Sequence, residues 1–357
     1  MPATSRQRLI DLLAIGRVAN LPTVWSNVIV GFLLAWSSVD LDFLAQLHTK
    51  EITLDGSIAN LLVLLIGTTA AYLFGTFLND WKDAAFDREH RPERAIPSGR
   101  WSPSAILGFA IGFASVATAG FLFLGISNIL ILVVGLVLLA CIVIYTLMHK
   151  VSPLAIIPMG LCRTLLYLLG FLAVYVPTLL NQSFAPAPGP LAPASPLSDL
   201  RHHSLLILLL MAMGILCYVA GLSLAARYES RPENLKVPRG FLWMLIFFPF
   251  LTHSWWWLWN RPPFLEGWHL AIPVLCGLLP FFLWTVRALF ILKNFIPRFV
   301  SRALAGLCLV DLLAFPGIAA TIRTGWTSLD SAPLLLAFIP LTLFIFALLL
   351  QRIAPAT

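Results

Sequence analysis

One stretch of the sequence, from Trp101 to Met148, contains no Asp, Glu, Lys or Arg. A helix that spans a lipid bilayer needs about 20 predominantly apolar residues, so this stretch is long enough for two such helices. The segment Gly125–Asn128 predicts the turn between them. The whole chain is of the same kind, because 59% of its residues are hydrophobic and 11% are charged, whereas soluble domains carry about 25% charged residues. The sequence therefore predicts an integral membrane protein that lies in the lipid bilayer.

Apolar segments of spanning length recur along the chain and predict an all-α polytopic membrane protein. Ten segments qualify, and nine helices span the membrane if one segment is re-entrant. We expect these helices to form one domain over residues 1–357. The ten expected spans are 18–39, 57–78, 104–124, 128–148, 152–176, 204–226, 240–259, 269–292, 302–322 and 332–350.

The distribution of Lys and Arg predicts the orientation of the chain. Cytoplasmic segments of membrane proteins are enriched in these residues. If the N-terminus lies inside, the inner segments carry 17 of the 23 Lys and Arg residues and the outer segments carry four. We therefore expect a bacterial inner-membrane protein with a cytoplasmic N-terminus. Because this distribution accounts for the net charge of +7, the charge does not indicate nucleic acid as a partner.

Acidic residues gather at the predicted cytoplasmic end of the second span. On a helix, Asp80, Asp83 and Asp87 fall within roughly 60° of one another, and Asn79 widens this face to roughly 100°. Like charges at such spacing repel one another, and a bound Mg²⁺ would turn this repulsion into coordination. The plainer interpretation is a solvated helix end in which Asp87 pairs with Arg91. Asp80 and Asp83 lack a basic residue four positions later, which favours the metal site.

The sequence Asn79-Asp80-x-x-Asp83-x-x-x-Asp87, followed by Arg91-Pro92-x-Arg94-x-Ile96-Pro97-Ser98-Gly99, resembles the first aspartate-rich motif of the UbiA-type intramembrane prenyltransferases. Ala95 stands where the family usually has proline. The resemblance implies a helix bundle around a central cavity, with Asp80, Asp83 and Asp87 as Mg²⁺ ligands and Asn79 beside them. It also implies the transfer of a prenyl group from a polyprenyl diphosphate to a small acceptor, which we expect to be aromatic.

The same resemblance assigns roles to polar residues elsewhere. Arg94 and Lys150 would contact the diphosphate, and Tyr145 matches a tyrosine that family members carry after the fourth span. Lys150 is otherwise an ordinary cytoplasmic anchor. Asn27 matches a polar position of the first span, where it lines the cavity or makes a hydrogen bond between helices.

The second aspartate-rich motif of the family should follow the sixth span, but the segment Tyr218–Glu233 contains no aspartate. One hypothesis is that Arg227 and Arg231 hold the diphosphate directly, because guanidinium groups match phosphate well, with Glu229 orienting them or contributing one metal ligand. The alternative is that ionisation chemistry is lost, and that the chain is a non-catalytic isoprenoid-lipid binder or a transporter on the same scaffold.

Charged residues also lie inside expected spans, and two of them are at similar depth. Arg163 and Asp311 lie at similar distances from the cytoplasmic side, and charges at such depth face a cavity or each other. A structural salt bridge and a pair that lines the substrate cavity both remain open. The segment around Met159, Gly160 and Arg163 also resembles the EboC-like branch of the family, whose members are associated with secondary metabolism.

Overall fold

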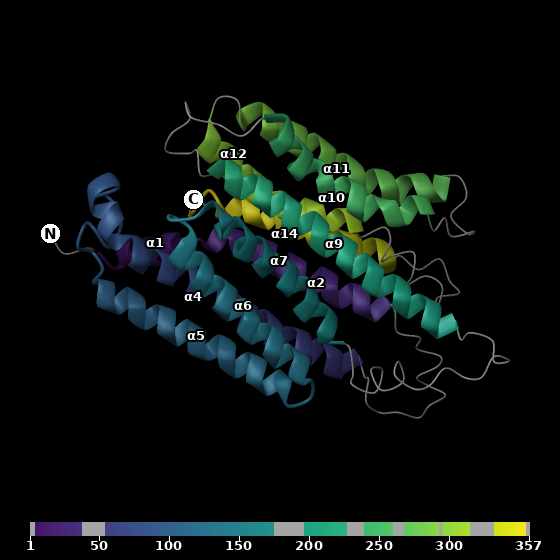
Figure 1. The fold of residues 1–357 in the computed structure, drawn as a ribbon, viewed down its shortest axis with the longest axis horizontal. Coiled ribbons are helices and arrows are strands. Elements are labelled where there is room, and N and C mark those ends of the chain that lie inside the picture. Colours follow the sequence, from purple (N-terminus) through teal and green to yellow (C-terminus); the bar gives the residue numbers. More distant parts are fainter. Residues whose placement is uncertain are drawn as a thin grey trace.

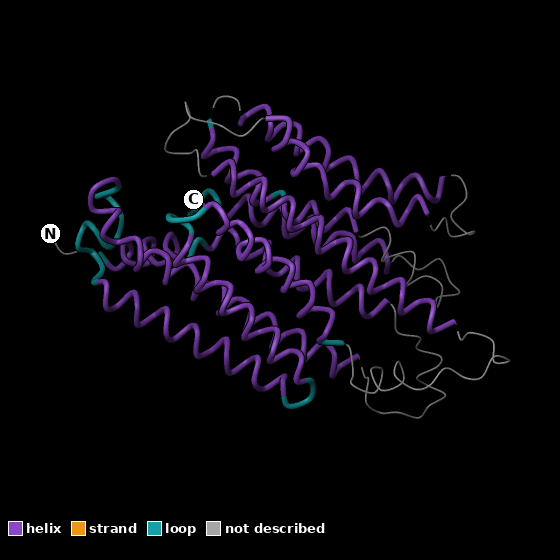
Figure 2. Tube along the Cα trace, viewed as in Figure 1, coloured by secondary structure: helices purple, strands orange, loops and turns teal. Residues whose placement is uncertain are grey.

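A computed structural model of the chain describes residues 4–37, 54–174, 196–226, 239–259, 268–292, 295–314 and 332–354. These residues form helices and the turns that join them, and no strand occurs among them (Figure 2). The all-α fold class is thereby confirmed. The helices are α1 (Ser5–Ile15), α2 (Leu21–Ser37), α4 (Leu54–His90), α5 (Pro103–Gly125), α6 (Ile129–Met148), α7 (Ile156–Leu172), α9 (Pro196–Ala226), α10 (Arg239–Trp259), α11 (Trp268–Leu292), α12 (Ile296–Ala305) and α14 (Ala332–Leu350), with short 3-10 helices at Val18–Asn20 and Pro153–Ala155.

The long helices lie side by side in an elongated bundle (Figure 1). Helices α4, α5 and α6 form one side, α10 and α11 form the other, and α2, α7 and α9 lie between them. Burial agrees with this arrangement, because 78% of the residues in the apolar segment Val18–Trp36 are buried, against 22% in α5. Helix α2 is therefore a core helix, whereas α5 presents most of its apolar surface outward, as a lipid-facing helix does.

Six helical segments of the described chain are long and apolar enough to cross a membrane, and α10, α11 and α14 contribute three shorter apolar stretches. One expected span differs from the structure. Instead of a helix over 302–322, α12 begins at Ile296 and ends at Ala305, and a second helical segment covers 307–314. Pro297 favours the early start, since its fixed φ suits the first turn of a helix. Residues 315–331, where this span was expected to end, lie outside the described residues.

Helices α2 and α7 pack with their backbones in direct contact. A Cβ atom on Gly31 would collide with the carbonyl oxygen of Tyr167, and one on Gly170 would collide with the carbonyl oxygen of Val28. Small residues allow this close approach between membrane helices, where dispersion contacts and hydrogen bonds replace the hydrophobic effect. The relative position of α2 and α7 is therefore tightly fixed.

Helix α4 is longer than a bilayer requires. Its 37 residues correspond to about 55 Å at 1.5 Å per residue, whereas the hydrocarbon core is about 30 Å thick. The sequence predicted a span over 57–78, but the helix continues to His90 and carries the acidic motif on its last turns. The helical spacing assumed for Asp80, Asp83 and Asp87 is thus present.

The N-terminal helix α1 is held at this end of the bundle by a two-pronged ion pair. Arg100 donates from Nε to Asp11 Oδ2 at 2.8 Å and from Nη2 to Asp11 Oδ1 at 3.0 Å. Such parallel hydrogen bonds between a guanidinium and a carboxylate fix orientation as well as distance. The segment that follows α1 consequently lies next to the end of α4.

Candidate functional site

A cavity of about 700 Å³ opens between the helices at the end of the bundle where α4 carries its aspartates. Its walls are largely apolar and come from α2, α4, α6, α7, α9, α12 and residue 307, whereas the residues around its mouth are polar. The residues that line it are Arg17, Asn20, Val24, Thr68, Ala71, Tyr72, Gly75, Thr76, Asn79, Asp83, Phe86, Asp87, Arg91, Arg94, Leu138, Ile142, Tyr145, Thr146, His149, Lys150, Ala155, Ile156, Met159, Cys162, Arg163, Leu166, Val219, Leu222, Ser223, Ala226, Val300, Leu304 and Leu307.

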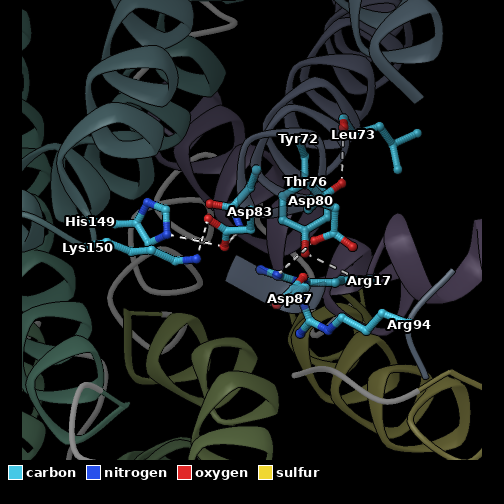
Figure 3. Close-up of polar contacts among 11 residues, drawn as sticks. Arg17, Tyr72, Leu73, Thr76, Asp80, Asp83, Asp87, Arg94, His149 and Lys150 are labelled. Atoms are coloured by element: carbon cyan, nitrogen blue, oxygen red, sulfur yellow. Dashed lines mark hydrogen bonds and ion pairs between the residues drawn. The ribbon is translucent and has the colours of Figure 1, made fainter. Parts of the chain in front are cut away.

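Three of the four polar residues of the acidic motif line the mouth of this cavity. Asn79, Asp83 and Asp87 are 8%, 8% and 4% exposed. They lie on one face of α4 because their spacing follows the helical repeat. Asp80 is not a lining residue, and it points toward Arg17 (Figure 3). The solvated helix end considered from the sequence does not describe these buried side chains.

Each aspartate is paired with a cation from a different part of the chain (Figure 3). Lys150 Nζ lies 2.7 Å from Asp83 Oδ1, and His149 Nε2 lies 3.4 Å from Asp83 Oδ2. Asp87 Oδ2 accepts a hydrogen bond of 2.8 Å from Arg94 Nη1 rather than from Arg91, its expected helical neighbour. Asp80 Oδ1 lies 3.4 Å from Arg17 Nη2. These cations offset the repulsion between the three carboxylates.

Arg17 and His149 were not among the residues that the sequence singled out. Arg17 has a left-handed backbone with φ 43, and its carbonyl oxygen accepts a hydrogen bond from the hydroxyl of Tyr72 at 3.3 Å. Burial lowers the pKa of Arg17, but Asp80 and other nearby groups outweigh it, so the pKa lies above its ordinary value and the guanidinium stays charged. Arg17 is 63 positions from Asp80, and no spacing rule connects them. His149, by contrast, directly precedes Lys150 in the sequence, so its position next to a singled-out residue could have indicated it.

The mouth of the cavity has the donor chemistry of a magnesium site. Mg²⁺ prefers oxygen ligands and takes one or two carboxylates together with substrate phosphates. Asn79 Oδ1 is buried and has no hydrogen-bond partner, which is costly for a polar atom unless a ligand completes its environment. Across the part of the chain that the structure describes, no three His, Cys, Asp or Glu side chains converge to hold a metal by themselves. A metal bound here would therefore need oxygen atoms from a substrate as well.

Lys150 and Tyr145 come from the end of α6, opposite the aspartates. Besides its ion pair with Asp83, Lys150 places Nζ 3.8 Å from the centre of the Phe86 ring. Tyr145 lines the cavity, and its ring centre lies 5.5 Å from that of His149. Lys150 is thus placed at the cavity mouth rather than free at the surface, although its role toward a substrate stays a prediction.

Asn27 does not line the cavity, and its side chain connects helices. It is fully buried, donates from Nδ2 to both oxygens of Asp311 at 3.0 and 2.9 Å, and accepts from Arg163 Nη1 at 3.2 Å. Arg163 and Asp311 are consequently linked through Asn27, and the described residues contain no direct ion pair between them. Of these three residues, Arg163 is the one that lines the cavity.

The segment that stands in place of the second aspartate-rich motif follows α9 in the sequence. Arg227, Glu229 and Arg231 lie outside the described residues, so the hypothesis that they hold a diphosphate stays a prediction. Helix α9, which leads into this segment, contributes Val219, Leu222 and further residues to the cavity wall.

Comparison with known proteins agrees with the fold. Residues 49–294 match the model of the UbiA prenyltransferase family. The fold is similar to that of a solved structure described in a study of digeranylgeranylglyceryl phosphate synthase in membranes, with a TM-score of 0.52 and 18% identity over 88% of this chain and 99% of that chain. An apo UbiA homologue from Aeropyrum pernix K1 gives a TM-score of 0.44 and 12% identity over 94% and 98%.

No curated protein sequence matches the chain. The matched family model nevertheless extends over more than half of its length, including the acidic motif, α5, α6, α7, α9 and α10. Several of these helices are long and apolar enough to cross a bilayer. The chain is an integral membrane protein and belongs to the UbiA prenyltransferase family.

Proposed function

We propose that this protein transfers a prenyl group from a polyprenyl diphosphate to a small, aromatic acceptor in a Mg²⁺-dependent reaction within the membrane. The observation that carries the proposal is the mouth of the cavity, where Asn79, Asp83 and Asp87 face the cations Lys150 and Arg94 and the imidazole of His149. Oxygen ligands and phosphate-binding cations are thereby present at the entrance to an apolar space. A diphosphate with a long hydrocarbon tail has this same division into a charged head and an apolar chain.

The donor set at the mouth fits a magnesium ion. Asp83 and Asp87 would supply carboxylate oxygens and Asn79 its unpartnered Oδ1, with Asp80 adding negative charge or a further ligand from the adjoining turn. When bound, the metal would neutralise negative charge on the departing diphosphate. The cofactor and the assignment of Asp80, Asp83 and Asp87 as its ligands are proposals.

The cations that now pair with the aspartates would bind the diphosphate. Arg94 and Lys150 each lie within 3 Å of an aspartate oxygen at the cavity mouth, so a small side-chain movement redirects their donors to phosphate oxygens. Arginine binds phosphate through parallel hydrogen bonds and lysine binds it as a point charge. Arg227 and Arg231 would add cations where the second aspartate motif is missing, with Glu229 orienting them.

The cavity suits the carbocation that forms at the carbon from which the diphosphate leaves. Its walls are built from side chains such as Val24, Leu138, Leu166 and Leu222, which exclude water that would otherwise quench the cation. Tyr145 and Tyr72 are aromatic lining residues near the mouth, and aromatic faces attract cations. The acceptor attacks the carbocation and then loses a proton.

The basic residues support a cytoplasmic position for the acidic motif and the N-terminus, in a bacterial inner membrane. The resemblance around Arg163 supports a role in secondary metabolism. These statements extend the proposal and need tests of their own, such as the accessibility of single cysteines placed at residue 6 and in the 91–100 turn.

Diphosphate release tests the proposed function. The full-length protein is purified and incubated with Mg²⁺, a panel of allylic diphosphates and candidate aromatic acceptors. We expect Mg²⁺-dependent release that Asp83→Ala abolishes and Glu89→Gln preserves, since Glu89 is an exposed carboxylate on the same helix end. No release with any chain length would overturn the proposal and favour a non-catalytic lipid binder or a transporter.

A further inference from the structure

We infer that Arg163 forms an anion-binding subsite deep in the cavity, which selects an acceptor that carries a carboxylate or phosphate group. This inference rests on the proposed function and specifies the acceptor that the proposed reaction would use. It depends on the Asn27–Arg163–Tyr167–Asp311 network, which links α2, α7 and the helical segment 307–314.

The network is asymmetric with respect to the cavity. Asp311 is fully buried and accepts hydrogen bonds from Asn27 Nδ2 and from the Tyr167 hydroxyl. Tyr167 and Asn27 are also fully buried. Arg163, at the other end, is partly exposed and lines the cavity. A molecule inside the cavity therefore encounters the cation of this network and not its carboxylate.

Most N–H donors of the Arg163 guanidinium have no hydrogen-bond partner among the described residues. Within the described part of the chain, its hydrogen bonding consists of one bond, from Nη1 to Asn27 Oδ1 at 3.2 Å. A guanidinium has five N–H donors in a planar fork, and charged groups at membrane depth are costly unless they are paired or face a polar ligand. The remaining N–H donors of Arg163 match the two oxygens of a carboxylate or the oxygens of a phosphate.

The packing of α2 against α7 holds this fork in place. Asn27 and Gly31 lie one turn apart on α2, and Arg163, Tyr167 and Gly170 share one face of α7. The backbone contacts at Gly31 and Gly170 leave no space for a Cβ atom. The cation is thus preorganised, which lowers the cost of binding an oriented ligand.

Depth separates this subsite from the diphosphate site. Arg163 lies seven residues after the start of α7 at Ile156, or about 10 Å along the helix axis. Lys150, which we assign to the diphosphate, precedes α7 at the cavity mouth. An acceptor whose anionic group binds Arg163 would lie between these two cations with its remaining part directed toward the mouth.

Ligand pairs that differ in one charge test the inference. The binding of a hydroxybenzoic acid and of its methyl ester is measured by titration calorimetry, and phenyl phosphate is compared with phenol in the same way. The full-length protein is used in nanodiscs, with Mg²⁺ and an unreactive thio-analogue of a prenyl diphosphate filling the donor site. We expect one or both anions to bind the wild type about tenfold or more tightly than the neutral partner, because the neutral partner lacks the charge-assisted hydrogen bonds.

Variants assign this preference to one residue. Arg163→Gln should remove it, Arg163→Lys should retain part of it, and Thr164→Ser should keep it, since Thr164 lies beside Arg163 but bonds to the carbonyl oxygens of Gly160 and Ala212. Elution in size-exclusion chromatography reports whether Arg163→Gln is folded. Equal binding of anion and neutral partner by the wild type would overturn the inference, and this comparison needs no variant.

Two further outcomes also test the inference about Arg163. If Arg163→Gln keeps the anion preference, or loses affinity for the thio-analogue while it elutes as a folded protein, Arg163 is not an acceptor subsite. If no prenyl transfer occurs but the Arg163-dependent anion preference is present, the subsite stands and the proposed transferase function fails. Comparing the affinities of the hydroxybenzoic acid and of phenyl phosphate shows which anion is preferred.

Discussion

Lys150 Nζ lies 2.7 Å from Asp83 Oδ1 and joins the end of α6 to the last turns of α4 across the mouth of the cavity. This ion pair connects a residue proposed to bind metal with one proposed to bind diphosphate. In the absence of both ligands, each side chain compensates the charge of the other.

Substitution of Lys150 and of Asp83 should affect the binding of different ligands. Lys150→Ala should raise the KM for the prenyl diphosphate by about tenfold or more, because it removes a charged hydrogen-bond donor. Asp83→Asn should instead raise the Mg²⁺ concentration at which activity is half-maximal. Steady-state kinetics with separate titrations of diphosphate and Mg²⁺ distinguishes the two, and identical effects of both variants on both titrations would contradict the assignment.

Arg94 and Arg88 provide a matched pair of arginines at the same end of the bundle. Arg94 lines the cavity and bonds Asp87 at 2.8 Å, whereas Arg88 is exposed and is not a lining residue. Arg94→Ala should lower kcat/KM for the diphosphate by about tenfold or more, since a guanidinium binds phosphate strongly. Arg88→Ala should remain within about twofold of wild type. Equal losses in the two variants would mean that general surface charge, not a specific contact, attracts the substrate.

The first aspartate motif could be predicted from the sequence because all of its elements are local. The spacing of Asp80, Asp83 and Asp87 places them near one another on any helix, and α4 continues through them to His90. The apolar segments likewise predicted the helices, since a bilayer demands a minimum length of apolar residues. Local patterns of this kind do not require knowledge of which helices are neighbours.

The ion pairs of the site could not be predicted, because they join segments that are far apart in the sequence. Arg17 reaches Asp80 only through the docking of α1. Asn27, which joins Arg163 to Asp311, lies 136 and 284 positions from them. The similar depth of Arg163 and Asp311 was visible in the sequence, but the intervening amide was not. The break at Gly306 was also missed. Next to it, the Tyr218 hydroxyl of α9 donates to the carbonyl oxygen of Ala303 at 2.8 Å, a contact between distant segments.

Arg17 should matter for catalysis although it precedes the first spanning helix. Arg17→Ala leaves Asp80 without its cation and removes a charged donor from the cavity mouth, so kcat/KM for the diphosphate should fall by about tenfold or more. Arg8→Ala is the matched control, because Arg8 is an exposed arginine on α1. Kinetics of both variants in nanodiscs is the measurement. Unchanged activity in Arg17→Ala would show that its ion pair is structural only.

The close contact between α2 and α7 gives a prediction about stability. Gly170→Ala adds a methyl group that meets the carbonyl of Val28, a backbone atom that cannot rotate away. Inserting one carbon into a packed contact typically costs about 1–3 kcal/mol, and more where only backbone can yield. Gly112→Ala on α5 is the control, since nothing lies within 4 Å of its Cβ position.

Thermal denaturation of the two purified variants, followed by size-exclusion chromatography, measures this difference. Gly170→Ala should denature at a lower temperature than wild type, whereas Gly112→Ala should match wild type or exceed it slightly because alanine favours helix more than glycine does. The same contact positions Asn27, which accepts a hydrogen bond from Arg163, so the folded fraction of Gly170→Ala should also bind anionic acceptors more weakly than wild type. A variant as stable as Gly112→Ala would mean that α2 and α7 separate easily, and the preorganisation argued for the Arg163 subsite would then have no physical basis.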